Sequence, residues 1–247
     1  MSTSSLTARR EWHPLLAKVA RSLNRVTSLV APPPSPPGTK QHKVVVIHVH
    51  PYGKQPSFTL ALGKTVRESL EIAGHEVRVT NLYEEGFQPA MSNQEHRAYL
   101  TAHHDGNIEE DIRPHVENLQ WCSALVFCYP TWWYSFPAVL KGWFDRVFIP
   151  GVAFDLPNGV EKPNPATGLI SRLKNVEKVG IVTTFGNNFW NVLHVGDPGR
   201  RIICRGLRPL FHPDCTVLWK GLYSAEGCSQ DEREGFLRDV KDSFSSF

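Results

Sequence analysis

SALVFCYPTWWYSFPAVLKGWFDRVF, residues 123–148, contains the pattern that decides the fold. It begins with a continuous apolar run, typical of a strand buried on both faces, which ends at Pro130. A helix can begin at Pro137, because the amide that proline lacks would be unpaired in a first turn. Apolar residues then recur on one helical face, at Val139, Leu140, Trp143, Phe144, Val147 and Phe148. The stretch therefore predicts a buried strand, an aromatic loop and a helix.

Further apolar and β-branched runs predict four more strands, at 43–50, 75–82, 176–186 and 215–219. Helical patterns lie between and after them, at 57–73, 199–211 and 229–244. Gly74 is expected to stop the first of these helices and Ser229 to cap the last. Alternating strands and helices predict an α/β domain with a doubly wound five-stranded parallel sheet and helices on both faces.

The N-terminal forty residues are expected to form a unit separate from the domain at 41–247. Residues 12–30 carry apolar and basic residues at the spacing of an amphipathic helix, and the proline-rich 31–40 predicts an extended linker. Three interpretations fit this unit: a disordered extension, a mitochondrial targeting peptide, or a helix that binds a membrane surface. We therefore expect a cytoplasmic protein, with a mitochondrial location through residues 1–40 as the alternative.

Charge and cysteine content limit the classes of function that the chain can have. The net charge of +3 arises from the N-terminal unit, so the main body gives no electrostatic reason to expect nucleic-acid binding. The five cysteines show no metal-ligand spacing, so reduced thiols are expected rather than a disulfide framework or a metal site. No apolar run approaches the length that spans a bilayer, so no transmembrane segment is predicted.

In a doubly wound sheet, ligands bind outside the carboxyl ends of the strands, here at loops 48–58, 129–137 and 183–197. The first loop offers a helix start near Ser57, whose amides and hydroxyl suit a phosphate, with His50 as a second contact. The alternative is that Ser57 only caps the helix.

The other two loops suit a flat ring. Trp132, Trp133 and Tyr134 offer aromatic faces to a planar ligand, although a dimer interface or a hydrophobic plug would use the same residues. Thr183 and Thr184 offer hydroxyls to the edge of a heterocycle. Gly186 allows close backbone approach, and Phe189, Trp190 and His194 follow. Trp143 and Phe144, at helical spacing, are expected in the core.

These motifs resemble the flavodoxin-like NAD(P)H dehydrogenase (quinone) family, which includes quinone reductases and modulators of drug activity. The resemblance covers about Lys43 to Trp219, with YPTWWYSFPAVLKGWFDRVF and TTFG as its most specific parts. It implies a homodimer that binds FAD or FMN non-covalently and uses NAD(P)H as co-substrate. It also implies cofactor-binding residues: His50, Ser57 and Phe58 on the phosphate side, Pro130, Thr131, Trp132, Trp133 and Tyr134 at the isoalloxazine, and Thr183, Thr184 and Gly186 at the pyrimidine edge.

Two catalytic residues also follow from the resemblance. Animal members have a tyrosine and a histidine in the third loop that assist proton movement. In the shorter loop of this sequence, Trp190 lies near the tyrosine position and His194 lies at or beside the histidine position.

The expected function is a flavin-dependent NAD(P)H oxidoreductase that reduces quinones or related acceptors by two electrons, with ping-pong hydride transfer. Two alternatives are a non-catalytic flavodoxin-type electron carrier and a regulatory subunit that keeps the flavin fold to bind a partner protein. Carriers generally have a phosphate loop rich in Thr, Ser and Gly and a strongly acidic surface, and the body of this chain has neither.

Overall fold

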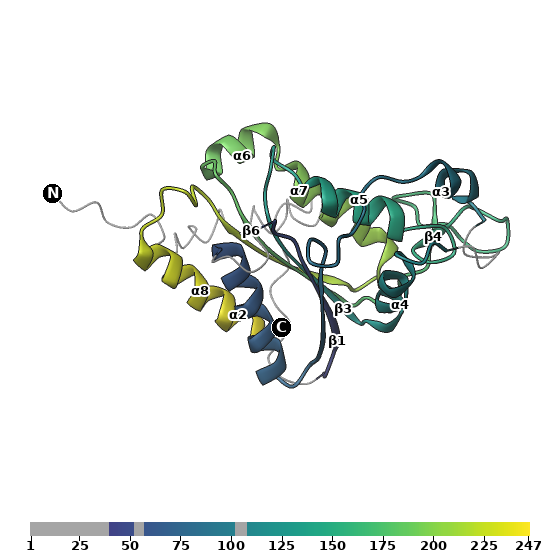
Figure 1. Cartoon of the computed structure of the whole chain (residues 1–247). Helices are drawn as coiled ribbons and strands as arrows, with labels where there is room; N and C mark the ends of the chain where they lie inside the picture. The colour runs from purple at the N-terminus through teal and green to yellow at the C-terminus, as the bar shows by residue number, and fades with distance from the viewer. Residues whose placement is uncertain (1–39, 52–56, 102–107) are drawn as a thin grey trace.

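The computed structural model describes residues 40–51, 57–101 and 108–247, and it confirms the predicted α/β fold (Figure 1). Five parallel strands form one sheet in the order β2-β1-β3-β6-β7. Their bounds are β1 Lys43–His48, β2 Glu76–Asn81, β3 Ala124–Pro130, β6 Lys178–Thr184 and β7 Thr216–Leu222. The chain order reverses direction between β1 and β3, which is where doubly wound sheets bind ligands.

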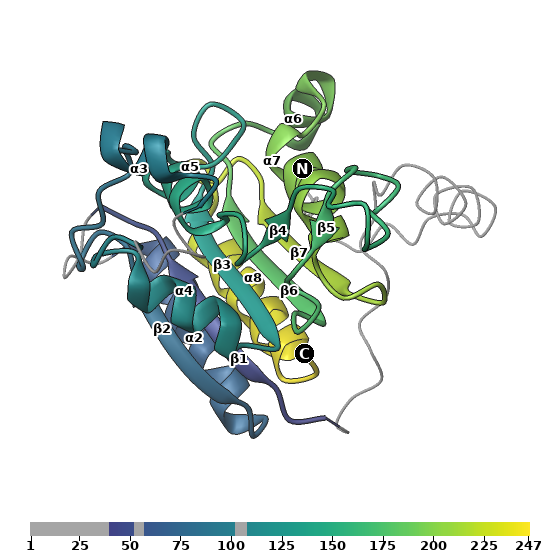
Figure 2. The same cartoon turned by 90° about the vertical axis from the view of Figure 1, so that its right-hand side faces the viewer.

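Helices cover both faces of the sheet (Figure 2). On one face lie α2 (Phe58–Ile72) and α8 (Gln230–Phe244), and on the other lie α4 (Arg113–Trp121) and α5 (Ala138–Val147). The two cores follow from strand geometry, since successive side chains point to opposite faces. In β1, Val44 and Val46 pack toward α2, whereas Val45 and Ile47 belong to the larger core beneath α4 and α5.

Two glycines show why the helices have these positions. Gly74 follows α2 with φ +87°, a left-handed conformation that ends the helix as predicted. Gly142 lies in α5 directly over a loop, and a Cβ there would come within 2.2 Å of the Pro89 carbonyl oxygen. The glycine of the LKGWF motif therefore allows the loop to pack closely on α5. Trp143 and Phe144 beside it are buried, as predicted.

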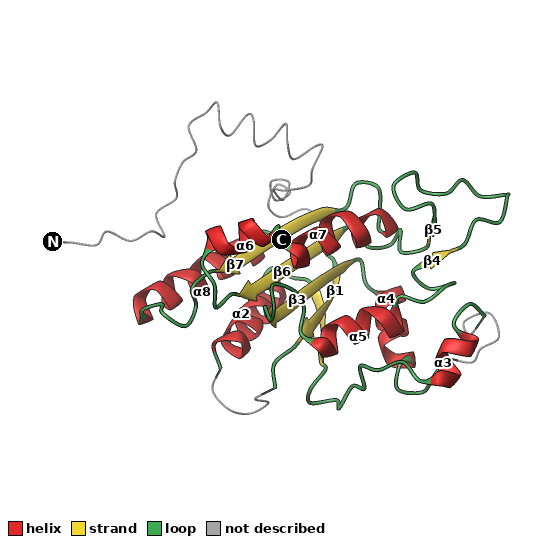
Figure 3. Cartoon of the chain, turned by 90° about the horizontal axis from the view of Figure 1, so that it is seen from above, coloured by secondary structure: helices red, strands yellow, loops and turns green. Residues whose placement is uncertain are grey.

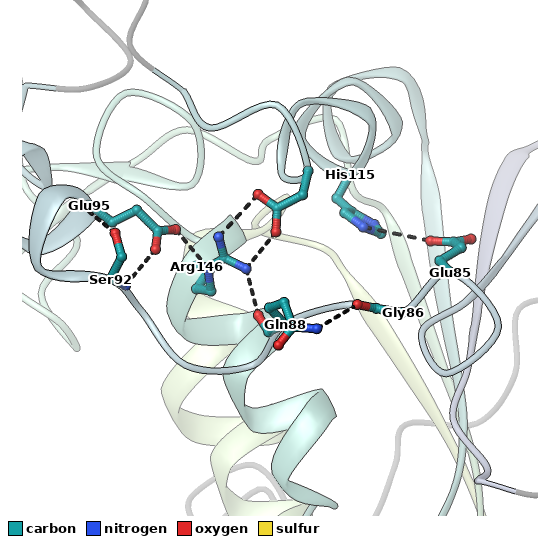
Figure 4. A network of polar contacts seen from close by, with 8 residues as sticks. Glu85, Gly86, Gln88, Ser92, Glu95, His115 and Arg146 are labelled. Carbon is teal, nitrogen blue, oxygen red and sulfur yellow. Dashed lines mark hydrogen bonds and ion pairs between the residues drawn. The ribbon is translucent and has the colours of Figure 1, made fainter.

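A charged network holds the same loop in place (Figure 4). The buried Arg146 of α5 donates to Glu95 at 2.6 Å, to Asp111 at 2.8 Å and to the Gln88 carbonyl. Glu95 also completes a capping box with Ser92 at the start of α3 (Asn93–Ala98). One guanidinium therefore ties α3 and the segment before α4 to α5.

Three features differ from the sequence predictions. Residues 148–177 contain a small antiparallel pair, β4 (Phe154–Asp155) and β5 (Ile170–Ser171), which the sequence analysis missed (Figure 3). The helical stretch expected at 199–211 is present but divided into α7 (Pro198–Arg201), a π-helix (Ile202–Leu207) and a 3₁₀ turn (Arg208–Leu210). β7 also runs to Leu222, beyond its predicted end.

The amphipathic helix and linker predicted at 1–40 lie outside the described residues, apart from Lys40. Among the residues that are described, no helix is both long enough and apolar enough to span a membrane.

Candidate functional site

The three predicted loops meet at the carboxyl edge of β1, β3 and β6. The Val49 amide donates to the Cys128 carbonyl at 2.9 Å, which joins the first loop to β3. The Thr131 amide donates to the Thr184 carbonyl at 2.7 Å, and the Thr131 and Thr183 hydroxyls are 2.7 Å apart. The second and third loops are thus joined through backbone and side chains, as the sheet order requires.

The aromatic loop folds as a two-residue hairpin turn. Trp132 and Ser135 exchange two backbone hydrogen bonds of 3.1 and 3.0 Å, and the two residues between them have positive φ, +48° for Trp133 and +64° for Tyr134. Positive φ at both central positions defines a type I′ turn, in which these two positions are most often occupied by Asn and Gly. A Trp-Tyr pair in this turn costs about 1–2 kcal/mol per residue, and such strain clusters at ligand sites. We call residues 132–135 the aromatic turn.

The aromatic turn offers unused surface. Trp133 is 95% exposed and Trp132 is 42% exposed. Within the described ranges, neither the Trp133 amide nor the Tyr134 amide donates to a protein acceptor. Rings and amides are therefore left for a ligand or a second protein copy.

The first loop places His50 and Ser57 together, with the Ser57 hydroxyl 3.0 Å from Nε2 of His50. Ser57 occupies the N-cap position of α2, but its side chain makes no capping hydrogen bond, so the capping alternative is wrong. The first turn of α2 thus keeps amides without a side-chain cap, as a helix that binds an anion requires.

Burial affects the histidines of this loop. It lowers the pKa of His50, with His48 adding a smaller effect. His48 itself is buried, its Nε2 lies 3.2 Å from the Thr59 carbonyl oxygen, and burial lowers its pKa as well. His50 is therefore neutral at pH 7 and can donate or accept a hydrogen bond there.

The remaining predicted residues have varied surroundings. Pro130 ends β3 and is half-buried, and Phe58 packs on the α2–α8 core with the Arg233 guanidinium 5.5 Å from its ring. Gly186 is exposed and has negative φ, and a Cβ there would meet only Glu226, at 3.5 Å. Phe58 is thus held by the core, whereas Gly186 leaves space for close approach.

Trp190 and His194 lie on α6 (Phe189–Val195), one turn apart. Trp190 is 69% exposed and His194 is also exposed. No described contact joins His194 to the aromatic turn, so its catalytic role stays a prediction.

Sequence reasoning missed a polar group behind the aromatic turn. Tyr129 of β3 is 1% exposed, and its hydroxyl has no hydrogen-bond partner in the protein. Asp197 has φ +48° and a buried carboxylate oxygen that also lacks a partner. The available signal was a tyrosine in the otherwise apolar strand 123–130.

Comparison with known proteins places this geometry in a family. A family model described as flavodoxin-like fold matches residues 42–199. The chain belongs to this flavodoxin-like family. Its sheet order, with the switch between β1 and β3, agrees with that membership.

Relatives of this flavodoxin-like chain include oxidoreductases. Ribosyldihydronicotinamide dehydrogenase [quinone] of Mus musculus is 34% identical over 128 residues, which cover 47% of this chain and 54% of the relative. The chain spans about half the length of the curated relatives that it matches.

Two solved structures share the fold. The NAD(P)H:quinone oxidoreductase from Methanothermobacter marburgensis has a TM-score of 0.66 and 24% identity, covering 83% of this chain and 96% of that one. An FMN-dependent NADH-azoreductase from Bacillus anthracis in complex with FMN has a TM-score of 0.64 and 15% identity, covering 83% and 98%.

In the ranges that the structure describes, no group of three or more His, Cys, Asp or Glu side chains is arranged to hold a metal ion.

Proposed function

We propose that this protein is a flavin-dependent NAD(P)H oxidoreductase that reduces quinones or related acceptors by two electrons in a ping-pong reaction. The observation that carries the proposal is the strained aromatic turn, with two amides that donate to no described protein acceptor, beside the Thr131–Thr183 hydroxyl pair. The names of relatives such as the mouse quinone dehydrogenase support the same reaction class.

The residues present fit a flavin, either FMN or FAD, held non-covalently. Ser57, His50 and the uncapped first turn of α2 would hold its phosphate side. The aromatic turn would hold the isoalloxazine, because an exposed tryptophan and unused amides suit a flat ring with polar edges. The half-buried Thr184 would lie at the pyrimidine edge, whereas the fully buried Thr183 would act through Thr131, whose hydroxyl lies 2.7 Å from its own.

When bound, the flavin supplies hydride chemistry at N5. The residues of this chain supply the rest: the turn positions the ring, and the loop amides stabilise negative charge at its edge. The exposed ring of Trp133 would cover the side of the flavin where both nicotinamide and acceptor bind. Because the two share one place, the oxidised nicotinamide would have to leave before the acceptor enters.

We also propose a homodimer. Phe189, Trp190, Leu193 and Val195 of α6 are all at least 44% exposed, as is Trp133 in the aromatic turn. The apolar side chains of α6 lie in the third loop of the site, so a second copy that covers them would help to enclose the site.

A reducing compartment such as the cytoplasm fits the cysteines, since all five are free thiols. Import into mitochondria through residues 1–40 is the alternative, and it concerns residues outside the described part of the chain.

Purification followed by release of the cofactor tests the proposal. We expect about one flavin per chain, identified as FMN or FAD by mass spectrometry, and steady NAD(P)H oxidation when a simple quinone is added. A protein that neither contains nor takes up flavin would overturn the proposal. Flavin binding without turnover would favour an electron carrier or a regulatory subunit.

A further inference from the structure

Buried polar atoms without partners are concentrated in one place. Five buried side-chain polar atoms in the described ranges have no hydrogen-bond partner in the protein, and four of them belong to Tyr129, Asp197, Arg200 and Trp219. We call these four residues the polar cluster. They lie behind the aromatic turn, on β3, on β7 and at the start of α7, and α7 touches the turn because Gly199 packs against the backbone of residues 134–135.

Electrostatic effects show that the members are neighbours. Burial raises the pKa of Tyr129 well above its ordinary value, and Asp197 contributes as the next cause. Arg200 opposes the rise that burial gives to the pKa of Asp197. The Arg200 guanidinium lies 5.6 Å from the centre of the Trp219 ring, which completes the group.

The four atoms have complementary hydrogen-bonding capacity. Nε of Arg200 and Nε1 of Trp219 can only donate, a carboxylate oxygen of Asp197 can accept, and the Tyr129 hydroxyl can do both. A buried polar atom that stays unpaired costs about 1–3 kcal/mol, whereas a buried water makes about three hydrogen bonds to such atoms. Water placed among these atoms would supply hydrogen-bond partners that the protein does not.

A row of hydroxyls leads from the cluster to the aromatic turn. Tyr129 and Thr183 are register partners on adjacent parallel strands, so their side chains lie on the same face of the sheet. Thr183 is fully buried, and its hydroxyl lies 2.7 Å from that of Thr131, the residue before the turn. Each hydroxyl can accept a proton on one side and donate its own on the other.

We propose that the polar cluster holds ordered water, and that this water bridges the Tyr129 hydroxyl to the Thr183–Thr131 hydroxyl pair to form a pathway that carries protons to the ring edge at the aromatic turn. The inference rests on the proposed function and deepens it. Reduction of a quinone by NAD(P)H transfers one hydride and consumes one further proton, giving NAD(P)⁺ and a hydroquinone. The pathway supplies that proton from inside the domain, whereas His194 would supply it from the exposed helix α6.

No member of the pathway has to become charged. Because burial disfavours the tyrosinate, Tyr129 acts by passing a proton on rather than by losing one. Burial also raises the pKa of Asp197, which brings this carboxyl closer to holding a proton for delivery.

The first test does not depend on activity. A high-resolution crystal structure of the protein should show ordered water within hydrogen-bonding distance of the Tyr129 hydroxyl and Asp197. In Tyr129→Phe, the water at that position should be lost while the fold is kept. A dry cluster, with Tyr129 bonded directly to another side chain of the cluster, would overturn the proposal.

The second test uses single-turnover kinetics of the flavin-loaded protein in H₂O and D₂O. Thr183→Val and Tyr129→Phe should slow the proton-dependent half-reaction by about 10²-fold, the lower end of the usual contribution of positioned proton-transfer groups. Thr183→Ser, which restores the hydroxyl, should recover most of the rate. Tyr99→Phe is the matched control, since Tyr99 lies on the α3 side and its hydroxyl bonds the Phe148 carbonyl.

The outcomes separate the two proposals. A protein that binds no flavin overturns the function and the pathway together. A flavoprotein in which Thr183→Val and Tyr129→Phe keep the parent rate and the parent solvent isotope effect overturns the pathway alone. The same holds if His194→Gln slows the proton-dependent step and Tyr129→Phe does not.

Discussion

Trp133 combines an unfavourable backbone with an almost fully exposed side chain, and neither property helps the isolated chain to fold. We expect Trp133→Gly to raise the free energy of unfolding of the flavin-free protein by about 0.5–1 kcal/mol, because glycine adopts positive φ without a Cβ clash but loses more entropy on folding. Urea denaturation measures the change. Ser224→Gly is the matched control, since Ser224 is exposed with φ +54° on the turn after β7.

The two glycine variants should differ in flavin binding. Both should gain stability, but only Trp133→Gly should release flavin more readily. If neither gains stability, the positive φ values are relieved in solution and the strain argument fails.

Trp133→Ala tests the ring itself. We expect flavin to bind about tenfold more weakly, equivalent to about 1.4 kcal/mol, since aromatic stacking typically contributes on this scale. Flavin fluorescence titration gives the dissociation constant. Ile72→Ala removes another exposed apolar side chain, 79% exposed at the far end of α2, and should leave flavin affinity unchanged. Equal losses in the two variants would contradict a ligand role for Trp133.

Two helices, α2 and α8, each follow a serine, and the two serine side chains make different contacts. Ser229 forms a capping box with Glu232 at the start of α8, whereas the Ser57 hydroxyl lies against His50 and does not cap α2. We therefore expect Ser229→Ala to cost about 1 kcal/mol of stability without changing flavin affinity. Ser57→Ala should cost less than half as much stability and weaken flavin binding.

Thermal unfolding and flavin titration of both serine variants provide the check. If Ser57→Ala is as destabilising as Ser229→Ala and leaves flavin binding intact, Ser57 acts as a cap in solution. The phosphate site would then have to be assigned elsewhere.

Helices and strands could be predicted where the sequence pattern fits only one type of secondary structure. β1, α2, β3 and α5 were found from continuous apolar runs and helical spacing, and Gly74 marked the end of α2. The pair β4–β5 was missed because two-residue strands are too short to show a period. The π-helix at 202–207 was predicted as ordinary helix, because over so few residues its wider turn hardly changes the residue types or their spacing.

The loops that form the candidate site could be predicted from the sequence, but the side-chain contacts within the site could not. The loop positions follow from sheet topology, so Thr131, Thr183 and the aromatic turn were expected at one edge. Contacts such as Ser57 with His50, and the grouping of Tyr129 with Asp197, depend on side-chain packing between segments far apart in sequence. Single-sequence patterns do not record such packing.

For the molecule as a whole, the domain is expected to be independent of the N-terminal unit. Deleting residues 1–39 should leave stability and flavin content unchanged, because the proline-rich linker separates that unit from β1 in sequence. The truncation keeps Lys40, which pairs with Glu177 at 2.5 Å. Loss of soluble protein after truncation would show that the unit packs on the domain.

The stability of the whole molecule should fall in mild acid. Burial lowers the pKa of His42 and of His115 to about 4, whereas the unfolded chain has histidine pKa values near about 6.5. Below that value the unfolded chain binds more protons than the folded chain, so stability is fully present above about pH 6.5 and is lost as the pH falls toward 4. Urea denaturation at pH 7 and pH 5 should show the loss.

His115→Phe isolates one contribution to this acid sensitivity. The ring of His115 lies edge-on to Phe87 at 5.1 Å, and a phenylalanine would keep that packing without a proton-binding site. The charged groups around it, Arg146 and Glu85 (Figure 4) together with Asp111, remain in the variant. Because each differential proton changes stability by about 1.4 kcal/mol per pH unit, His115→Phe should lose measurably less stability between pH 7 and pH 5 than the parent. An unchanged slope in His115→Phe would show that the acid sensitivity arises at other groups.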